Sequence, residues 1–112
     1  MDAFLALAEP TRRNIMEMLV KSGNLSASDI YSKFKSTPPA ISQHLKVLRE
    51  ANLVRVEKRA QKRIYYVNPG PMKELERWIQ TFTKDWQGRH DRLEAMLKER
   101  MDAEAARQKH DR

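Results

Sequence analysis

The chain has 112 residues, which fits one domain, and it has no cysteine, which excludes disulfide bonds and thiolate metal ligands. Its formal net charge of +7 favours a nucleic acid or an anionic membrane surface as partner. The sequence has neither an apolar run long enough to cross a bilayer nor the pattern of a secretory signal, so we expect a soluble, cytoplasmic protein.

The first part of the chain predicts three short helices. Residues 2–8 form the first, and a second begins at Pro10, because proline suits the first turn of a helix. The second helix ends at the turn-forming residues 22–24. A third helix opens at Ser26, with Asp29 placed to complete a capping arrangement.

A fourth helix is predicted from Pro38 to about Ala51. Ser36 or Thr37 can cap it, and prolines are tolerated in its first turn. Its buried stripe follows helical steps of four and three residues: Ile41, Leu45 and Leu48.

The pattern then changes from helical to alternating. Residues 53–59 and 63–68 are rich in β-branched and aromatic side chains, and they predict two strands joined by a basic turn at residues 60–62. Residues 68–71 (Asn-Pro-Gly-Pro) end the second strand, and a long helix follows from about Pro71.

Large apolar residues recur along this last helix at heptad-like spacing, with Arg89 at one missing position and Gly88 as a weak point. They are Leu75, Ile79, Phe82, Trp86, Leu93 and Met96. Large apolar residues are scarce from residue 101 onward. We therefore expect one domain over residues 1–100 and a flexible tail over residues 101–112.

Residues 25–51 have the order of a helix-turn-helix, in which the second helix faces outward. Burial of its aliphatic stripe turns four other residues toward solvent: Pro39, Ser42, Gln43 and Lys46. Such side chains suit hydrogen bonds to base edges in a major groove, while Ser36 and Thr37 at the helix N-terminus suit a phosphate. The alternative is an ordinary amphipathic helix with a solvated outer face.

The predicted hairpin carries positive charge around its tip, at Lys58, Arg59, Lys62 and Arg63. Residues 33–63 hold 9 Lys and Arg against Glu50 and Glu57, whereas residues 71–112 hold 10 basic against 9 acidic residues. The excess charge thus lies on neighbouring elements. This favours a phosphate-contacting arm over charge that only keeps the hairpin soluble.

Three segments resemble the ArsR/SmtB family of repressors: residues 8–13 (AEPTRR), 25–54 and 63–67 (RIYYV). The run SQHLKVLREA, followed by a basic hairpin, is the most specific part of a resemblance that covers about residues 3–97. It implies a mainly α fold with a small β-hairpin, a winged helix-turn-helix of about five helices. It also implies a homodimeric repressor of transcription that binds double-stranded DNA at an inverted repeat.

The same resemblance implies a dimer interface on the first and last helices. The residues concerned are Phe4, Leu5, Leu75, Ile79, Phe82, Trp86 and Leu93.

The chain is most similar to the metal-independent branch of that family. Where metal-sensing members carry cysteines in the third helix, this chain has Ser26 and Ser28. His90 and Glu94 lie one turn apart, but two ligands at this spacing arise easily on a charged helix. We therefore expect no metal and no cofactor, and the sequence leaves any small-molecule effector unknown.

Some alternatives stay open. His44 packs beside the buried stripe or approaches the DNA backbone, and packing is favoured; Trp78 and Trp86 fill an interface in preference to lining an effector pocket. No phosphate loop, nucleophilic cysteine or catalytic triad indicates an enzyme. We expect a sequence-specific DNA-binding regulator, with a winged-helix protein-interaction module as the alternative. A membrane-surface role is disfavoured by the nearly neutral last helix.

Overall fold

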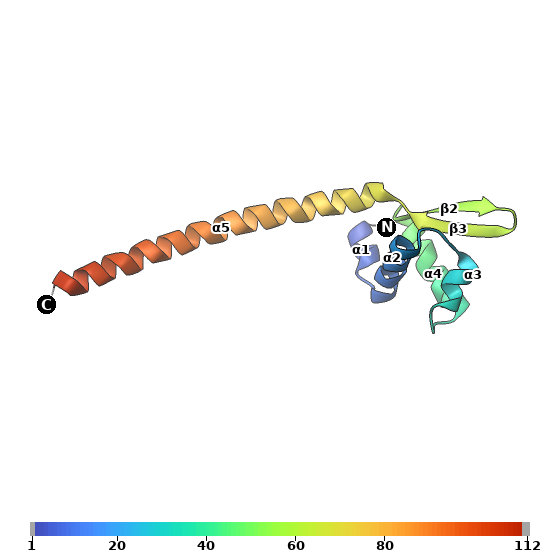
Figure 1. Cartoon of the computed structure of the whole chain (residues 1–112), viewed down its shortest axis with the longest axis horizontal. Coiled ribbons are helices and arrows are strands. Elements are labelled where there is room, and N and C mark those ends of the chain that lie inside the picture. The colour runs from blue at the N-terminus through green and yellow to red at the C-terminus, as the bar shows by residue number, and fades with distance from the viewer. Residues whose placement is uncertain (1, 111–112) are drawn as a thin grey trace. The chain divides into compact units, whose positions relative to one another are not determined.

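Figure 1 shows the computed structural model of the chain, which describes residues 2–110. The chain divides into two compact units, one up to Leu75 and one from Glu76 onward. Five helices and three strands occur in the described residues: α1 (Ala3–Leu7), α2 (Pro10–Ser22), β1 (Leu25–Ser26), α3 (Ala27–Ser32), α4 (Pro38–Glu50), β2 (Val54–Arg59), β3 (Lys62–Val67) and α5 (Pro69–His110). The mainly α fold with a small β-hairpin is confirmed.

The helices of the first unit begin where side chains accept hydrogen bonds from free backbone N–H groups. At α2, Oε2 of Glu9 accepts from the backbone N–H of Arg12 at 2.9 Å. At α3, Ser26 and Asp29 form the capping box expected from the sequence, with distances of 3.1 and 3.4 Å. At α4, Thr37 is the N-cap and two prolines occupy the first turn. Each such cap stabilises its helix by about 1 kcal/mol.

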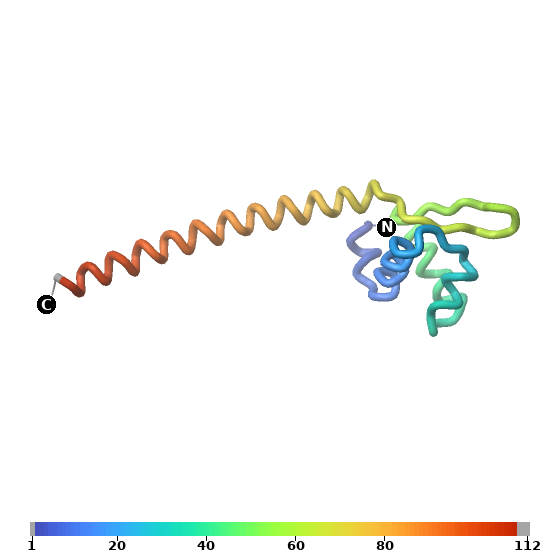
Figure 2. The backbone as a smooth tube through the Cα atoms, in the orientation of Figure 1, coloured from blue at the N-terminus to red at the C-terminus, as the bar shows by residue number. Residues whose placement is uncertain are grey.

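The three strands form one antiparallel sheet in the order β1-β3-β2. β2 and β3 pair from Val54↔Val67 to Arg59↔Lys62, which leaves a turn of only two residues, 60–61. Figure 2 shows this hairpin as a narrow loop that extends beyond the helices of the first unit. The hairpin predicted from the alternating pattern is therefore confirmed.

β1 is the one strand that the sequence analysis missed. It pairs with β3 through Leu25↔Tyr65 and Ser26↔Ile64. A strand of two residues is too short to display an alternating pattern, and Ser26 also serves as the N-cap of α3.

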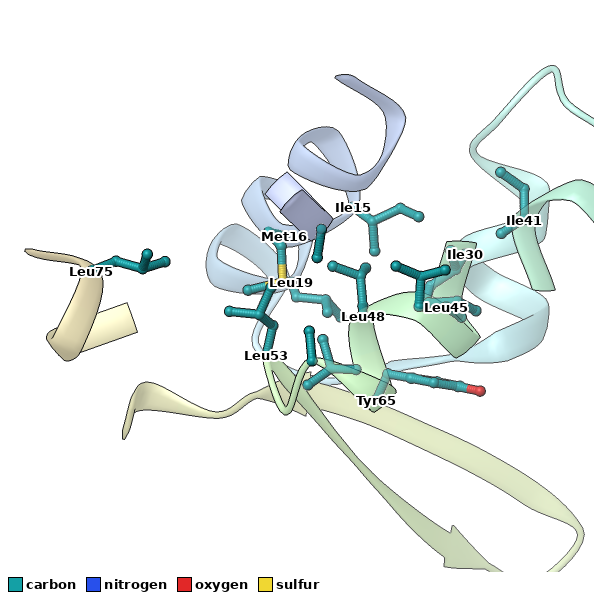
Figure 3. Close-up of a cluster of buried hydrophobic side chains, with 14 residues drawn as sticks. Ile15, Met16, Leu19, Ile30, Ile41, Leu45, Leu48, Leu53, Tyr65 and Leu75 are labelled. Atoms are coloured by element: carbon teal, nitrogen blue, oxygen red, sulfur yellow. The ribbon is translucent and has the colours of Figure 1, made fainter. Parts of the chain in front are cut away.

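The core of the first unit gathers aliphatic side chains from α2, α3 and α4 beside the sheet (Figure 3). The predicted stripe of α4 is buried, since Ile41, Leu45 and Leu48 are at most 1% exposed. Burial of each such side chain is worth about 1.5–3 kcal/mol. With this face of α4 fixed in the core, its opposite face points to solvent.

Leu75, which was predicted to lie at a dimer interface, is only 8% exposed and belongs to the core of the first unit. Figure 3 shows its side chain directed toward the cluster that contains Met16 and Leu19. The heptad-like spacing placed Leu75 with the apolar residues that follow it, but its position at the end of the first unit buries it instead.

The second unit is the remainder of α5, a helix that continues through Gly88 to His110. The helix also runs through residues 101–110, where the sequence analysis expected a tail, because this segment is rich in strong helix formers such as Ala, Glu, Arg and Lys. Flexibility of that segment stays a prediction, and residues 111 and 112 lie outside the described part. None of the described helices is long and apolar enough to cross a membrane.

Candidate nucleic-acid interface

The exposed face of α4 carries the polar residues that the sequence analysis selected. Pro39, Ser42, Gln43 and Lys46 are all exposed. They project from a helix whose other side is held by the core, so their directions are fixed by packing and not by local flexibility. A rigid polar face of this kind can present hydrogen-bond donors and acceptors to the edges of base pairs.

The N-terminus of α4 offers donors to an anion. Ser36 and Thr37 are exposed, and Oγ1 of Thr37 accepts from the backbone N–H of Ala40 at 3.4 Å. This bond uses the hydroxyl oxygen as acceptor and leaves its O–H free to donate. Together with the positive end of the helix dipole, the two hydroxyls suit a phosphate.

The hairpin places like charges directly opposite each other. Lys58 pairs with Arg63 and Arg59 pairs with Lys62 across the two strands, and all four side chains are exposed. Such cross-strand pairs of equal charge destabilise a sheet. An anionic partner that lies against the hairpin would offset this repulsion.

A single acidic residue moderates the charge of the hairpin. Oε2 of Glu57 lies 3.3 Å from Nη2 of Arg59, and Oε1 of Glu57 accepts from the hydroxyl of Tyr66 at 3.1 Å. Within the described residues, the other three cations have no ion-pair partner. They are Lys58, Lys62 and Arg63. The charge available to an external anion is therefore concentrated on these three.

A cluster of polar side chains beside α4, which includes Arg12 and His44, was not predicted from the sequence. The guanidinium of Arg12 on α2 contacts His44 on α4 and two backbone carbonyls at the end of α1, while Arg13 donates to the carbonyls of Leu7 and Ala8. The side chain of His44 is 23% exposed and takes part in a polar contact as well as packing. Because residues 12 and 44 are far apart in sequence, no local pattern could have revealed this contact.

Glu9 completes that cluster. Burial alone would raise the pKa of the Glu9 carboxyl, but the hydrogen bond from the backbone of Arg12, the nearby His44 and a hydrogen bond with Thr11 together lower it below its ordinary value of 4.5. The carboxylate is thus held in its charged form at the N-terminus of α2, where the helix dipole also favours it.

Apolar side chains remain exposed on both helices that were predicted to dimerise. Phe4 and Leu5 on α1 are 45% and 59% exposed. A row of large apolar side chains on the second unit is also exposed. That row includes four predicted residues, Ile79, Phe82, Trp86 and Leu93, and four further ones, Trp78, Met96, Leu97 and Met101. The rings of Trp78 and Phe82 stack with centroids 5.3 Å apart.

Two candidate metal ligands of α5, His90 and Glu94, contact each other. Nε2 of His90 lies 3.1 Å from Oε1 of Glu94, and the His90 ring stacks on Trp86. Among the described residues, no group of three or more His, Cys, Asp or Glu side chains is arranged to hold a metal ion.

A helix-turn-helix with an exposed polar second helix, followed by a cationic hairpin, defines the winged helix-turn-helix class of DNA-binding transcriptional regulators. Comparison with known proteins agrees. Residues 9–56 match the model of the family described as bacterial regulatory protein, arsR family. The chain is 32% identical over 81 residues to the transcriptional repressor SdpR of Bacillus subtilis, covering 72% of this chain and 89% of that protein. The chain therefore belongs to the arsR family, as its resemblance indicated.

Other relatives and solved structures agree with this assignment. An uncharacterized HTH-type transcriptional regulator of Methanocaldococcus jannaschii is 31% identical over 74 residues, covering 66% of this chain and 83% of that protein. The crystal structure of a possible transcriptional regulator for arsenical resistance is 35% identical, with a TM-score of 0.66 over 73% of this chain and 84% of that one. An ArsR-like transcriptional regulator from Rhodococcus sp. RHA1 shares the fold, with a TM-score of 0.75 at 23% identity over 85% of this chain and 86% of that chain.

Proposed function

We propose that this regulator is a homodimeric repressor that binds an inverted repeat in double-stranded DNA. The exposed face of α4 enters the major groove, and the hairpin grips the flanking backbone. The observation that carries the proposal is the pairing of like charges across the hairpin, which costs stability unless an anion lies against it. The two-fold symmetry of a dimer requires two half-sites about 34 Å apart, one turn of DNA.

The proposal gives two groups of residues different tasks. Ser42, Gln43 and Lys46 on α4 read bases or the adjacent phosphates, whereas the cations of the hairpin bind phosphates only. Ser36 and Thr37 fix the end of α4 on a backbone phosphate. Sequence preference should therefore depend on α4, and salt dependence should depend mainly on the hairpin.

Two variants test this division. We expect Gln43→Ala to change the preferred sequence, measured by selection from random duplexes. We expect Lys62→Ala to weaken binding to every duplex alike and to lower the slope of log affinity against log salt by about 1, because one fewer counterion is released. Lys98→Ala removes one exposed charge from the second unit and serves as the matched control.

The outcomes separate the proposal from its alternative. An unchanged salt slope in Lys62→Ala, with normal binding, would remove the hairpin from the interface. A wild-type protein that binds random and genomic promoter duplexes equally at two salt concentrations would contradict sequence-specific binding. The winged-helix protein-interaction module would then be the better description.

A further inference from the structure

The guanidinium of Arg12 joins three helices of the first unit. Its Nε donates to the carbonyl of Ala6 at 2.6 Å, and its Nη2 lies 3.5 Å from the carbonyl of Leu5, both at the end of α1. Its Nη1 lies 3.3 Å from Nδ1 of His44 on α4. With these three contacts, the guanidinium plane is fixed relative to the imidazole.

This contact determines where the proton of His44 resides. An arginine side chain has five N–H donors and no acceptor, so Nδ1 of His44 has to be the acceptor and carries no proton. The competing partner, Oε2 of Glu9, lies 3.7 Å from Nδ1, beyond hydrogen-bond distance. In this contact, the N–H of the imidazole that remains available to another partner is at Nε2.

The Nε2 atom of His44 is not completely buried. In the described part of the chain, no buried side-chain nitrogen or oxygen lacks a hydrogen-bond partner, and no described residue is a partner of Nε2. His44 directly follows Gln43, on the flank of α4 that turns toward α2. A donor on the flank of a recognition helix suits the phosphates that border the groove, because the bases lie in front of the helix.

We propose that His44 donates its Nε2–H to a DNA phosphate and that Arg12 is the positioning residue that presents this donor. The proposal rests on the docking of α4 in the major groove proposed above. It adds to α4 an uncharged phosphate contact on a side chain that is mostly buried and already held in place. Arg12 acts from behind, through Nδ1, and does not touch the DNA.

Two substitutions separate the two nitrogens of His44. Asparagine can place its side-chain oxygen near the position of Nδ1, which keeps the acceptor for Arg12 but removes the distal donor. Glutamine can place its side-chain NH₂ near the position of Nε2, which keeps the donor for DNA. We expect His44→Asn to lower the affinity for the operator about tenfold and His44→Gln to stay within about threefold of wild type.

Two further measurements characterise the contact. The salt slope should be the same in wild type and both His44 variants, because a neutral donor releases no counterion. Arg12→Ala should lower affinity in the wild-type background but much less in the His44→Asn background, a coupling that a double-mutant cycle measures. Melting temperatures of all variants show which losses come from destabilisation of the fold.

The outcomes are distinct from those of the docking test. If His44→Asn binds as wild type does while His44→Gln is impaired, His44 only receives Arg12 and the proposal is overturned. If both variants bind as wild type does while Gln43→Ala still changes sequence preference, the docking of α4 stands and this inference alone fails. A salt slope that falls by about 1 in both variants would mean that His44 is charged in the complex, which also overturns the proposal.

Discussion

Glu9 combines two roles at a single residue, since it caps α2 and lies beside His44. The pKa of its carboxyl is lowered in the folded chain, so the charged form stabilises the fold. This contribution is fully present above the ordinary pKa of 4.5 and is lost as the pH falls through the lower, folded-state pKa. Stability should therefore depend on the charge of Glu9 only on the acidic side of pH 4.5.

The substitution Glu9→Gln tests this. Glutamine keeps a side-chain oxygen to cap α2 but loses the charge, so we expect the free energy of unfolding at pH 7 to fall by less than about 1 kcal/mol. The difference from wild type should shrink as the pH falls below 4.5, as measured by denaturant unfolding over a pH series. Glu17→Gln removes the same charge from the exposed surface of α2, outside its first turn. A difference that stays constant down to acidic pH would contradict the expectation.

Some positions of the candidate site could be predicted from the sequence, and others could not. The outward face of α4 could be predicted because helical geometry fixes it once Ile41, Leu45 and Leu48 are buried. The contact between Arg12 and His44 could not, because it joins residues 32 positions apart through tertiary packing. The burial of Leu75 in the core of the first unit could not be predicted for the same reason, since spacing along a helix does not show where the core ends.

At the scale of elements, the hairpin of the first unit contains a strained backbone conformation in its turn. Its two-residue turn contains Ala60 with φ of 55°, a left-handed conformation that costs an alanine about 1–2 kcal/mol. Asn52, which follows the end of α4, has φ of 59°, but asparagine tolerates this conformation much better. The alternating pattern that predicts the hairpin does not show the strain at Ala60.

We expect Ala60→Gly to raise the free energy of unfolding by about 0.5–1 kcal/mol, because relief of strain exceeds the greater entropy of glycine in the unfolded chain. Asn52→Gly is the matched control at the other left-handed position, and its effect should be close to zero. Urea unfolding at neutral pH measures both. Equal effects of the two substitutions, or destabilisation by Ala60→Gly, would show that the turn stores no strain.

Helices and strands could be predicted from the sequence where they were long enough to show a hydrophobic period. The 13 residues of α4 and the two six-residue strands of the hairpin show clear periods, and both were found. β1 has two residues and shows none. The continuation of α5 to His110 was not predicted because large apolar residues are scarce there, whereas the polar residues of this segment have high intrinsic helix propensity.

At the scale of the whole molecule, the second unit is an amphipathic helix without an internal core. Large apolar side chains of this helix are half or more exposed and follow helical spacing: Ile79, Phe82, Trp86, Leu93 and Leu97. An apolar row of this length is unusual on a monomer and fits a second copy of the chain, in line with the dimer interface that the family resemblance implies. Phe4 and Leu5 on α1 add a second exposed apolar patch.

Trp86→Glu places a charge in the middle of that row and should convert the proposed dimer to a monomer at micromolar concentration, measured by sedimentation velocity. Thr81→Glu introduces the same charge on the opposite side of the helix and should leave the dimer intact. Because a monomer can occupy only one half-site, Trp86→Glu should bind a duplex with two half-sites no more tightly than a duplex with one, whereas Thr81→Glu should keep the preference for two. A Trp86→Glu protein that remains dimeric and keeps that preference would move the interface away from the second unit, leaving α1 as its remaining site.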